Sequence, residues 1–365
     1  MNILISGAGV AGLSAAVDLG ARGHRVTIVE RSSHFRVNGS PIDVRGDSIG
    51  IVEKMGLLDA VRARQVRMTA NAAFVDAGGN VVAPLPLAEF GDSGDIEIAR
   101  EDLANLLAGA LPADATVLFR DSVETLADDG SGVDVRFVSG RTERFDVVIG
   151  ADGLHSTVRH LTFGPESRFA KHLGVYSAIA DLPGAVGTGE SNPTYNFPGH
   201  LASIMRYQDR ALAVFAFRSD PIAYDYHDLD VQKKILTDAF AGHDEWRIPE
   251  LIAAANADPE LYFDSASQIH LPTWHQGRVV LIGDAAHAAS GLSGRGTSLA
   301  LLGAYFLAEE LDAHDLTAGF ERYEARLRGY VDSAQATVGA GADLIVPATW
   351  EAIEARNDRI RSMGS

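Results

Sequence analysis

Four residues near the N-terminus have the types and the spacing of a dinucleotide-binding site. Gly7, Gly9 and Gly12 make the pattern G-x-G-x-x-G directly after an apolar stretch, and Glu30 closes the next apolar stretch. In such a loop the first glycine permits a tight turn, the second lets the backbone approach a pyrophosphate, and the third lets helix and strand pack closely. An acid in the position of Glu30 can accept hydrogen bonds from both hydroxyls of an adenosine ribose and disfavours a 2′-phosphate. The pattern therefore predicts a site for FAD or NAD rather than NADP.

A second glycine-rich segment, GDAAHAASGLSGRGTSLAL, runs from Gly283 to Leu301. A carboxylate at Asp284 could bind the ribityl hydroxyls of a flavin. The apolar helix expected from Thr297 would present N-terminal N–H groups, with their partial positive charge, to the N1–C2 edge of a reduced flavin. Arg295 is the one charged residue in the loop before this helix. Its charge either adds to the positive potential of the helix N-terminus and favours the anionic reduced flavin, or its side chain extends into solvent and has no such effect.

A third segment contains Asp152 and Gly153, after the apolar stretch 146–149 and before a helix expected to begin at Ser156. Asp152 and Arg159 could brace phosphates and the loop around them. An ordinary turn followed by a helix N-cap explains the same residues equally well, because Asp and Ser favour both positions.

These residues need a scaffold of strands and helices to bring them together. We expect strands over residues 2–6, 25–29, 146–149 and 279–282, and helices over 10–22 and 297–311. In the middle of the chain, residues 173–181, 201–207 and 212–218 also have the pattern of strands. Paired β-like segments around Asp76–Gly79 indicate a hairpin, residues 231–241 a helix and residues 344–365 a closing helix.

Composition excludes several classes of function. The net charge of −18 makes nucleic acid an unsuitable partner, and the chain has no cysteine for a disulfide, a thiolate metal site or a cysteinyl flavin link. No metal-binding spacing occurs, so we assign no metal. No apolar run approaches the roughly 18 residues of a membrane span, and the N-terminus lacks a signal sequence, so we expect a cytoplasmic protein. His287, close to Asp284, is either a base or a loop histidine with a structural role.

The three segments, in this order and spacing, resemble the class A FAD-dependent monooxygenases of the p-hydroxybenzoate hydroxylase fold. The first glycine loop matches their first FAD motif, Asp152-Gly153 their DG motif and Gly283-Asp284 their GD motif. The form G-x-G-T-S-L-A-L is similar to bacterial members that modify polyketides and antibiotics, the tetracycline-monooxygenase-like enzymes. The chain departs from many of them in having Ala289-Ser290-Gly291 where they have proline, which leaves the fine details of the substrate open.

This resemblance implies an α/β fold: a Rossmann-type FAD-binding domain, an inserted substrate domain with an antiparallel sheet over the flavin, and a C-terminal helix. The FAD-binding domain would comprise residues 1–69, 97–170 and 268–330. The substrate domain would comprise residues 70–96 and 171–267, and the C-terminal helical segment residues 331–365.

The resemblance also implies the reaction. An aromatic or polyketide-like small molecule would be hydroxylated through a flavin C4a-hydroperoxide, with non-covalent FAD, O₂ and transiently bound NADPH or NADH. A flavin-dependent reductase or oxidase of an unsaturated small molecule on the same fold is the alternative. Because the flavin carries the chemistry, no catalytic side chain is obligatory. We expect a monomer or dimer, with no nucleic-acid or membrane partner.

Two sets of residues are expected at the site. The cofactor set adds Arg100, which begins a family-like R-x-x-L helix, and Arg45 to the motif residues. It comprises Gly7, Gly9, Val10, Ala11, Gly12, Glu30, Arg31, Arg45, Arg100, Asp152, Gly153, Arg159, Gly283, Asp284, Gly294, Arg295, Gly296 and Thr297. The substrate set lies in the expected middle strands, where a place in the sheet core is the alternative. It comprises Tyr195, Asn196, His200, Met205, Arg206, Phe215 and Phe217.

Overall fold

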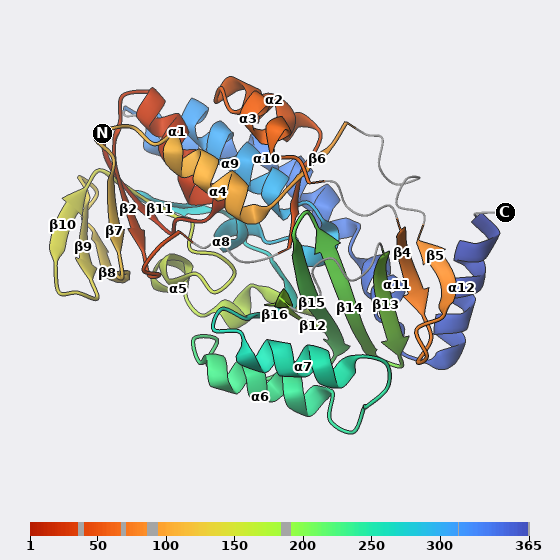
Figure 1. Ribbon diagram of the computed structural model, residues 1–365. Helices are drawn as coiled ribbons and strands as arrows, with labels where there is room; N and C mark the ends of the chain where they lie inside the picture. The colour runs from red at the N-terminus through yellow and green to blue at the C-terminus, as the bar shows by residue number, and fades with distance from the viewer. Residues whose placement is uncertain (36–39, 67–70, 86–93, 184–190, 313, 364–365) are drawn as a thin grey trace.

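A computed structural model describes residues 1–35, 40–66, 71–85, 94–183, 191–312 and 314–363. Two large sheets organise the chain, each with helices packed against it (Figure 1). Within the described residues, no helix is both long and apolar enough to cross a membrane.

The first sheet has six strands in the order β17-β18-β11-β1-β2-β7. Their bounds are β17 (His275–Gln276), β18 (Val279–Leu281), β11 (Val147–Gly150), β1 (Asn2–Ser6), β2 (Arg25–Glu30) and β7 (Thr116–Phe119). All neighbours are parallel except β17, which pairs antiparallel with β18. The central strands are mostly apolar because helices cover both faces of a parallel sheet, and Ile3, Leu4 and Ile5 are fully buried.

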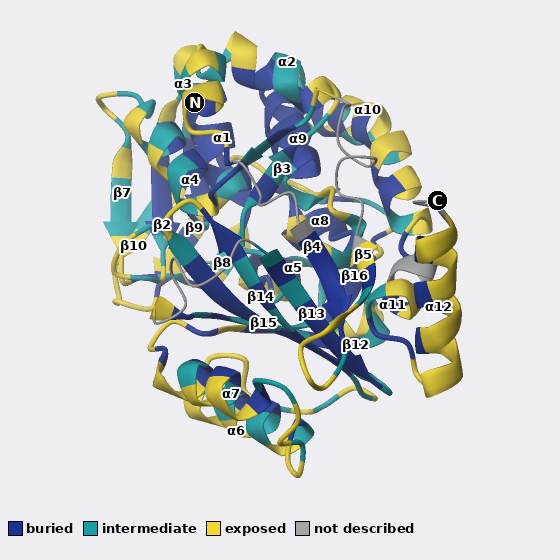
Figure 2. Cartoon of the chain, turned by 45° about the vertical axis from the view of Figure 1, so that its right-hand side comes forward, coloured by how far each residue is buried: buried dark blue, intermediate teal, exposed yellow. Residues whose placement is uncertain are grey.

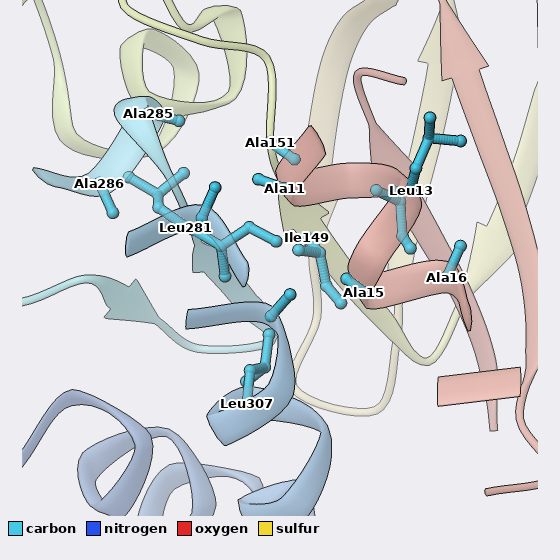
Figure 3. Packing of buried hydrophobic residues seen from close by; sticks show 14 of the residues in the cluster. Ala11, Leu13, Ala15, Ala16, Ile149, Ala151, Leu281, Ala285, Ala286 and Leu307 are labelled. Atoms are coloured by element: carbon cyan, nitrogen blue, oxygen red, sulfur yellow. The ribbon is translucent and has the colours of Figure 1, made fainter. Parts of the chain in front are cut away.

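Helices with small residues allow close packing around this sheet. The covering helices include α1 (Val10–Ala21), α4 (Arg100–Gly109), α5 (Thr157–Phe163), α9 (Gly296–Glu310) and α10 (Leu316–Ala336). Figure 3 shows Ala11 and Ala15 of α1 close to Ile149 and Leu281, with Leu307 of α9 below them in this view. This cluster joins residues from the two ends of the chain into one core.

Smaller elements complete this half of the molecule. They are β3 (Ile42–Val44), β6 (Ile96–Ile98), α2 (Asp47–Lys54), α3 (Leu58–Ala63), α8 (Asp284–His287), the turns η2 (Glu166–Arg168) and η4 (Gly291–Ser293), and the sheet of β8 (Val123–Asp128), β9 (Val133–Phe137) and β10 (Thr142–Phe145). Strands β3 and β6 pair with each other as an antiparallel ribbon.

The second sheet has seven strands in the order β16-β12-β15-β14-β13-β4-β5. Their bounds are β4 (Asn71–Val75), β5 (Val81–Leu85), β12 (Ala170–Asp181), β13 (Ser191–Phe197), β14 (His200–Tyr207), β15 (Arg210–Arg218) and β16 (Tyr262–Ile269). Neighbours are antiparallel except β13 and β4, which run parallel. The expected hairpin forms β4 and β5.

One face of this sheet packs against α6 (Leu229–Ala239) and α7 (Ile248–Ala257), and the opposite face looks toward the six-stranded sheet (Figure 1). Near the C-terminus, α12 (Trp350–Met363) packs against β5 and β13, and α11 (Gly339–Ile345) packs against β12. The outer side of α12 is largely exposed (Figure 2).

The α/β fold with an inserted, largely antiparallel sheet is therefore confirmed. The domain boundaries stay a prediction, and residues 67–70 and 86–93 at two of them lie outside the described residues. Two details differ from expectation. The closing helix expected over residues 344–365 is present as α12 but begins only at Trp350, and α10 runs across the boundary expected at residue 330.

Candidate cofactor site

The first glycine loop is shaped by close backbone contacts at two of its three glycines. Gly7 has a left-handed φ of +104°, and a Cβ placed on it would lie 2.4 Å from the carbonyl oxygen of Ala151. A Cβ on Gly12 would lie 2.0 Å from the carbonyl oxygen of Gly7. A Cβ on Gly9, in contrast, would meet no atom within 4 Å. Gly9 therefore borders open space at the start of α1, where no side chain caps the helix.

Glu30 is fixed beside this opening. Its carboxylate accepts hydrogen bonds from the backbone N–H groups of Ala8 and Ser32, both at 2.8 Å. A carboxylate has further acceptor capacity, so these bonds leave it able to accept from a ribose. The neighbouring Arg31 is exposed and places Nη1 2.6 Å from Nδ1 of His227, in the loop before α6.

The second glycine segment touches the first. Gly283 has a φ of +59°, and a Cβ on it would lie 2.8 Å from the Cβ of Ala11. Asp284, the first residue of α8, is exposed although protein atoms surround its carboxyl group, and we refer to this partly enclosed position as the recess. This enclosure raises the pKa of the Asp284 carboxyl, and the positive charge of Arg100 opposes the rise.

Arg100 faces the same recess from the first turn of α4. Its side chain is exposed, and no hydrogen bond or ion pair joins it to another of the described residues. The guanidinium is thus available for an anionic or hydroxyl-bearing group held above Asp284.

Asp152 and Gly153 form the turn before α5. The Asp152 carboxylate accepts hydrogen bonds from the hydroxyl of Ser156 and from the backbone N–H of Val158, the latter at 3.0 Å. Ser156 in turn caps α5 by accepting from the backbone N–H of Arg159. The sequence was consistent with either a cofactor role or a turn followed by a helix N-cap. The hydrogen bonds of Asp152 and Ser156 are those of a turn with an N-cap.

Arg159 is placed differently from the expectation that it contacts the cofactor. Its side chain is 0% exposed and donates to the carbonyl oxygens of Ala285 at 3.0 Å and Leu154 at 2.6 Å, and to Glu166 at 2.7 Å. A fully enclosed guanidinium cannot reach a ligand in the recess. Arg159 instead connects the turn before α5 to α8, and so positions the backbone next to Asp284.

Arg45 links β3 to the glycine loop before α9. Its Nη2 donates to Asp43 at 2.7 Å, and its backbone N–H donates to Ser298 Oγ at 3.0 Å. A Cβ on Gly294, which has a left-handed φ of +60°, would lie 3.6 Å from Nη1 of Arg45. The loop geometry thus brings Arg45 to the edge where the flavin ring is expected.

The start of α9 is open, as its expected role requires. No side chain caps this helix, and Gly296 and Thr297 in its first turn are partly exposed. Arg295 is exposed, and its backbone N–H is bound by Ser293 Oγ at 3.1 Å. An exposed charge is screened by salt, which weakens its field on a neighbouring ring.

The expected substrate residues divide between the two faces of the seven-stranded sheet. Tyr195, Phe215 and Phe217 belong to the core between the sheet and α6 and α7. Nε2 of His200 donates to the backbone carbonyl oxygen of Ala239 in α6 at 3.0 Å, on this same face. Strand alternation puts Arg206 there as well. These five residues take the core alternative that the sequence left open.

Asn196 and Met205 lie on the opposite face, toward the glycine loops. Asn196 donates to the carbonyl oxygen of Ile345 at 3.0 Å and is buried under α11 and α12. Met205 is half-buried and packs near Val66 and Ala99.

Further residues on this face were missed by sequence reasoning. They are the half-exposed Ile179, Val214 and Ser203, in register with one another across β12, β15 and β14, and Ser177, two residues before Ile179 on β12. The signal was present as period-two alternation, which places these small and aliphatic side chains opposite the aromatic ones. The aromatic face drew attention because large rings often line pockets, but here they build the core.

His287 is neither in a loop nor hydrogen-bonded: it ends α8, and neither ring nitrogen has a hydrogen-bond partner among the described residues. It is buried against Trp274, with ring centroids 4.7 Å apart, and burial lowers its pKa to about 3. The described residues contain no cluster of side chains suited to a metal ion.

Comparison with known proteins decides the family. The profile of the FAD binding domain family matches residues 1–185 and 256–338. The chain belongs to this family. It is 34% identical over 344 residues to a flavin-dependent monooxygenase of an unknown prokaryotic organism, covering 92% of this chain and 88% of that protein. It is also 41% identical over 342 residues to the uncharacterized protein Rv1260 of Mycobacterium tuberculosis, covering 92% and 91% of the two chains.

Solved structures support the same family assignment. The crystal structure of the tetracycline destructase Tet(51) matches with a TM-score of 0.85 at 30% identity, covering 99% of this chain and 96% of that one. Tet(55) matches with a TM-score of 0.84 at 32% identity, covering 99% and 95%. The protein is an FAD-dependent monooxygenase of this family, and its reaction uses a small-molecule substrate, O₂ and a reductant.

The residues present fit FAD. The space beside Gly9 and the uncapped start of α1 suit a pyrophosphate. Asp284, with Arg100 nearby and bound to no other described residue, suits a polyhydroxyl chain, and the open start of α9 suits a ring edge that gains negative charge. When bound, FAD supplies the electron transfer to O₂ that no amino-acid side chain provides.

Proposed function

We propose that this enzyme hydroxylates an aromatic or polyketide-like small molecule, using NADPH or NADH as the reductant. The observation that carries this proposal is the likeness over nearly the whole chain to the tetracycline destructases, whose name states that they act on tetracycline. The named monooxygenase relatives favour this activity over the reductase or oxidase alternative.

The inner face of the seven-stranded sheet supports a flat, largely apolar substrate. Aliphatic and small polar side chains, including Ile179, Ser203 and Val214, are half-exposed there and look toward the glycine loops. Such a surface offers area to a ring system and a few hydroxyls for orientation. No charged side chain interrupts the inner-face positions of β14 from Leu201 to Met205.

In this proposal the chain contributes binding, orientation and the exclusion of water. Gly9 and the start of α1 hold the pyrophosphate, Glu30 holds the adenosine ribose, and Asp284 with Arg100 holds the ribityl chain. The open first turn of α9 would lie beside the ring edge and would favour a negative charge there. Arg159 positions α8 from within the core.

The test begins with purified protein loaded with FAD. NADPH and NADH oxidation is followed while phenols, quinones and tetracycline-like compounds are added one at a time. We expect a subset of ring compounds to stimulate oxidation, and isotopically labelled O₂ to leave one labelled atom in the product and one in water. Stimulated oxidation without label in any product would contradict hydroxylation and favour an oxidase.

Asp220→Asn provides a matched control, because Asp220 is an exposed acid outside the cofactor recess. It should oxidise NAD(P)H like the wild type, whereas Asp284→Asn should lose FAD and activity together.

A further inference from the structure

Two carboxyl groups lie opposite each other on the β3–β6 ribbon. The antiparallel register pairs Asp43 with Glu97, while Ile42 and Val44 on β3 and their partners on β6 point to the other face, into the core. Side chains of directly opposed residues have Cβ atoms about 5 Å apart. Asp43 and Glu97 are therefore neighbours on the face that is turned away from the core.

The charges around this pair do not balance. Arg45 donates to Asp43 at 2.7 Å and lies 3.6 Å from the carboxylate of Asp95, so one guanidinium serves two acids. Within the described part of the chain, no hydrogen bond or ion pair reaches the carboxyl group of Glu97. Asp59 and Arg62 of α3, which packs on the core face of β6, are both exposed. One acid of the cluster thus lacks a counter-charge.

A shared proton is the physical alternative to a counter-charge. Burial and then the negative charge of Asp43 raise the pKa of Glu97 to about 7, with Arg45 opposing the rise. Burial also raises the pKa of Asp43, again against Arg45. Two such close carboxyl groups titrate as a pair, holding one proton between them near neutral pH.

The pair is connected to the segment that faces the flavin. Arg45, which binds Asp43, lies against Gly294, and its backbone N–H is bound by Ser298 in the first turn of α9. The carbonyl oxygen of Asp43 is 3.5 Å from the same hydroxyl. The start of α9 is where reduction of the bound flavin would place a negative charge.

We propose that Asp43 and Glu97 together hold the proton that is taken up when the flavin at this site is reduced, with Glu97 as the titrating member. The inference rests on the proposed function, because it assigns a proton required by that reaction.

The overall reaction consumes one proton. The substrate C–H, O₂, NAD(P)H and one H⁺ become the substrate C–OH, NAD(P)⁺ and water. O₂ accepts four electrons, two from the nicotinamide and two from the substrate carbon. The hydride brings its own proton, and the Glu97 carboxyl supplies the further one to the site. The resulting carboxylate regains a proton from solvent through its partly exposed side.

The test uses Glu97→Gln and, as the matched control, Glu53→Gln on the exposed side of α2. The first measurement is infrared difference titration, which detects the carbonyl stretch of a protonated carboxyl group and requires neither substrate nor nicotinamide. We expect a carboxyl that titrates near pH 7 in the wild type and in Glu53→Gln, and its absence in Glu97→Gln. In Asp43→Asn the signal should remain but titrate at lower pH, because the repelling charge is gone.

The second measurement is the pH dependence of the flavin midpoint potential, with a chemical reductant. A negative charge on the reduced ring would raise the pKa of Glu97. Between its pKa of about 7 with the flavin oxidised and the higher pKa with the flavin reduced, the wild type takes up as much as one more proton on reduction than Glu97→Gln does. The wild-type potential should therefore fall more steeply with pH in that range.

Two results would overturn the proposal: no carboxyl titrating near neutrality, or identical potential slopes in the wild type and Glu97→Gln. Neither readout depends on turnover. A failure to find substrate-stimulated NAD(P)H oxidation would therefore count against the proposed function while these experiments still decide the role of the pair.

Discussion

Two glycines of the first loop should respond in opposite ways to the same substitution. A Cβ on Gly12 would lie 2.0 Å from the carbonyl oxygen of Gly7, at least about 1 Å closer than ordinary contact. Because the obstacle is backbone, it cannot move aside, and Gly12→Ala should cost about 3 kcal/mol in the free energy of unfolding, the upper end for overpacking. Gly9→Ala meets no atom within 4 Å and should cost about 1 kcal/mol or less, as a weaker N-cap.

The affinity for FAD should respond in the opposite way, with the direct effect at Gly9. If the pyrophosphate approaches the backbone at Gly9, the methyl group of Gly9→Ala occupies that space and should weaken FAD at least about tenfold, or about 1.4 kcal/mol. Denaturant unfolding of the FAD-free protein and titration with FAD by flavin fluorescence measure the two effects separately. Gly9→Ala binding FAD with an unchanged dissociation constant would refute the pyrophosphate position. A Gly12→Ala variant as stable as the wild type would refute the packing argument.

Four further predictions concern charged residues. Glu30→Ala should weaken FAD by about 1–3 kcal/mol, the scale of lost charged hydrogen bonds, and an unchanged dissociation constant would remove Glu30 from the site. Asp284→Ala should lose more, since Asp284 lies in the recess, so a yellow and fully active variant would contradict its role. Arg295→Met should lower the midpoint potential only slightly because Arg295 is exposed and screened, and a large drop would show that the side chain folds over the ring. For His155, burial lowers the pKa but hydrogen bonds to Asp264 and Glu166 outweigh it and raise the value to about 9. The protonated His155 therefore stabilises the folded state, fully below pH 6.5 and progressively less as the pH rises toward 9. If the free energy of unfolding depends on pH equally in His155→Gln and in the wild type, this prediction is wrong.

The sequence predicted the cofactor-binding half well because its signals are local. The close packing at Gly12 and the apolar helix after Gly296 each show within one strand–loop–helix unit, whereas Gly7 also meets Ala151 from a distant part of the chain. Such units carry their own pattern of glycines and apolar runs, so their chemistry can be read without knowing the neighbours.

The residues that line the substrate face were harder to predict, because they depend on which face of the sheet is covered by helices. The alternation of Phe215 and Phe217 with Val214 and Ala216 was visible, but only the position of α6 and α7 decides which set is core. In the same way, Arg159 matched a cofactor motif, yet its partner Ala285 lies far along the chain. The Asp43–Glu97 pair was not found, because strand register brings together two residues from short, separate segments.

The strand order of the six-stranded sheet has a consequence for how the protein is made. β1 is synthesised first, but the sheet is complete only when β18 has paired beside β11, and Gly283 meets Ala11 only then. All strands of the inserted sheet precede β18 in the chain, so they leave the ribosome earlier. At about 5–20 residues per second, the N-terminal loop waits tens of seconds for its distant partner. If FAD contacts both loops, as we propose, it binds late, and flavin absorbance would mark a chain in which the two distant loops have already met.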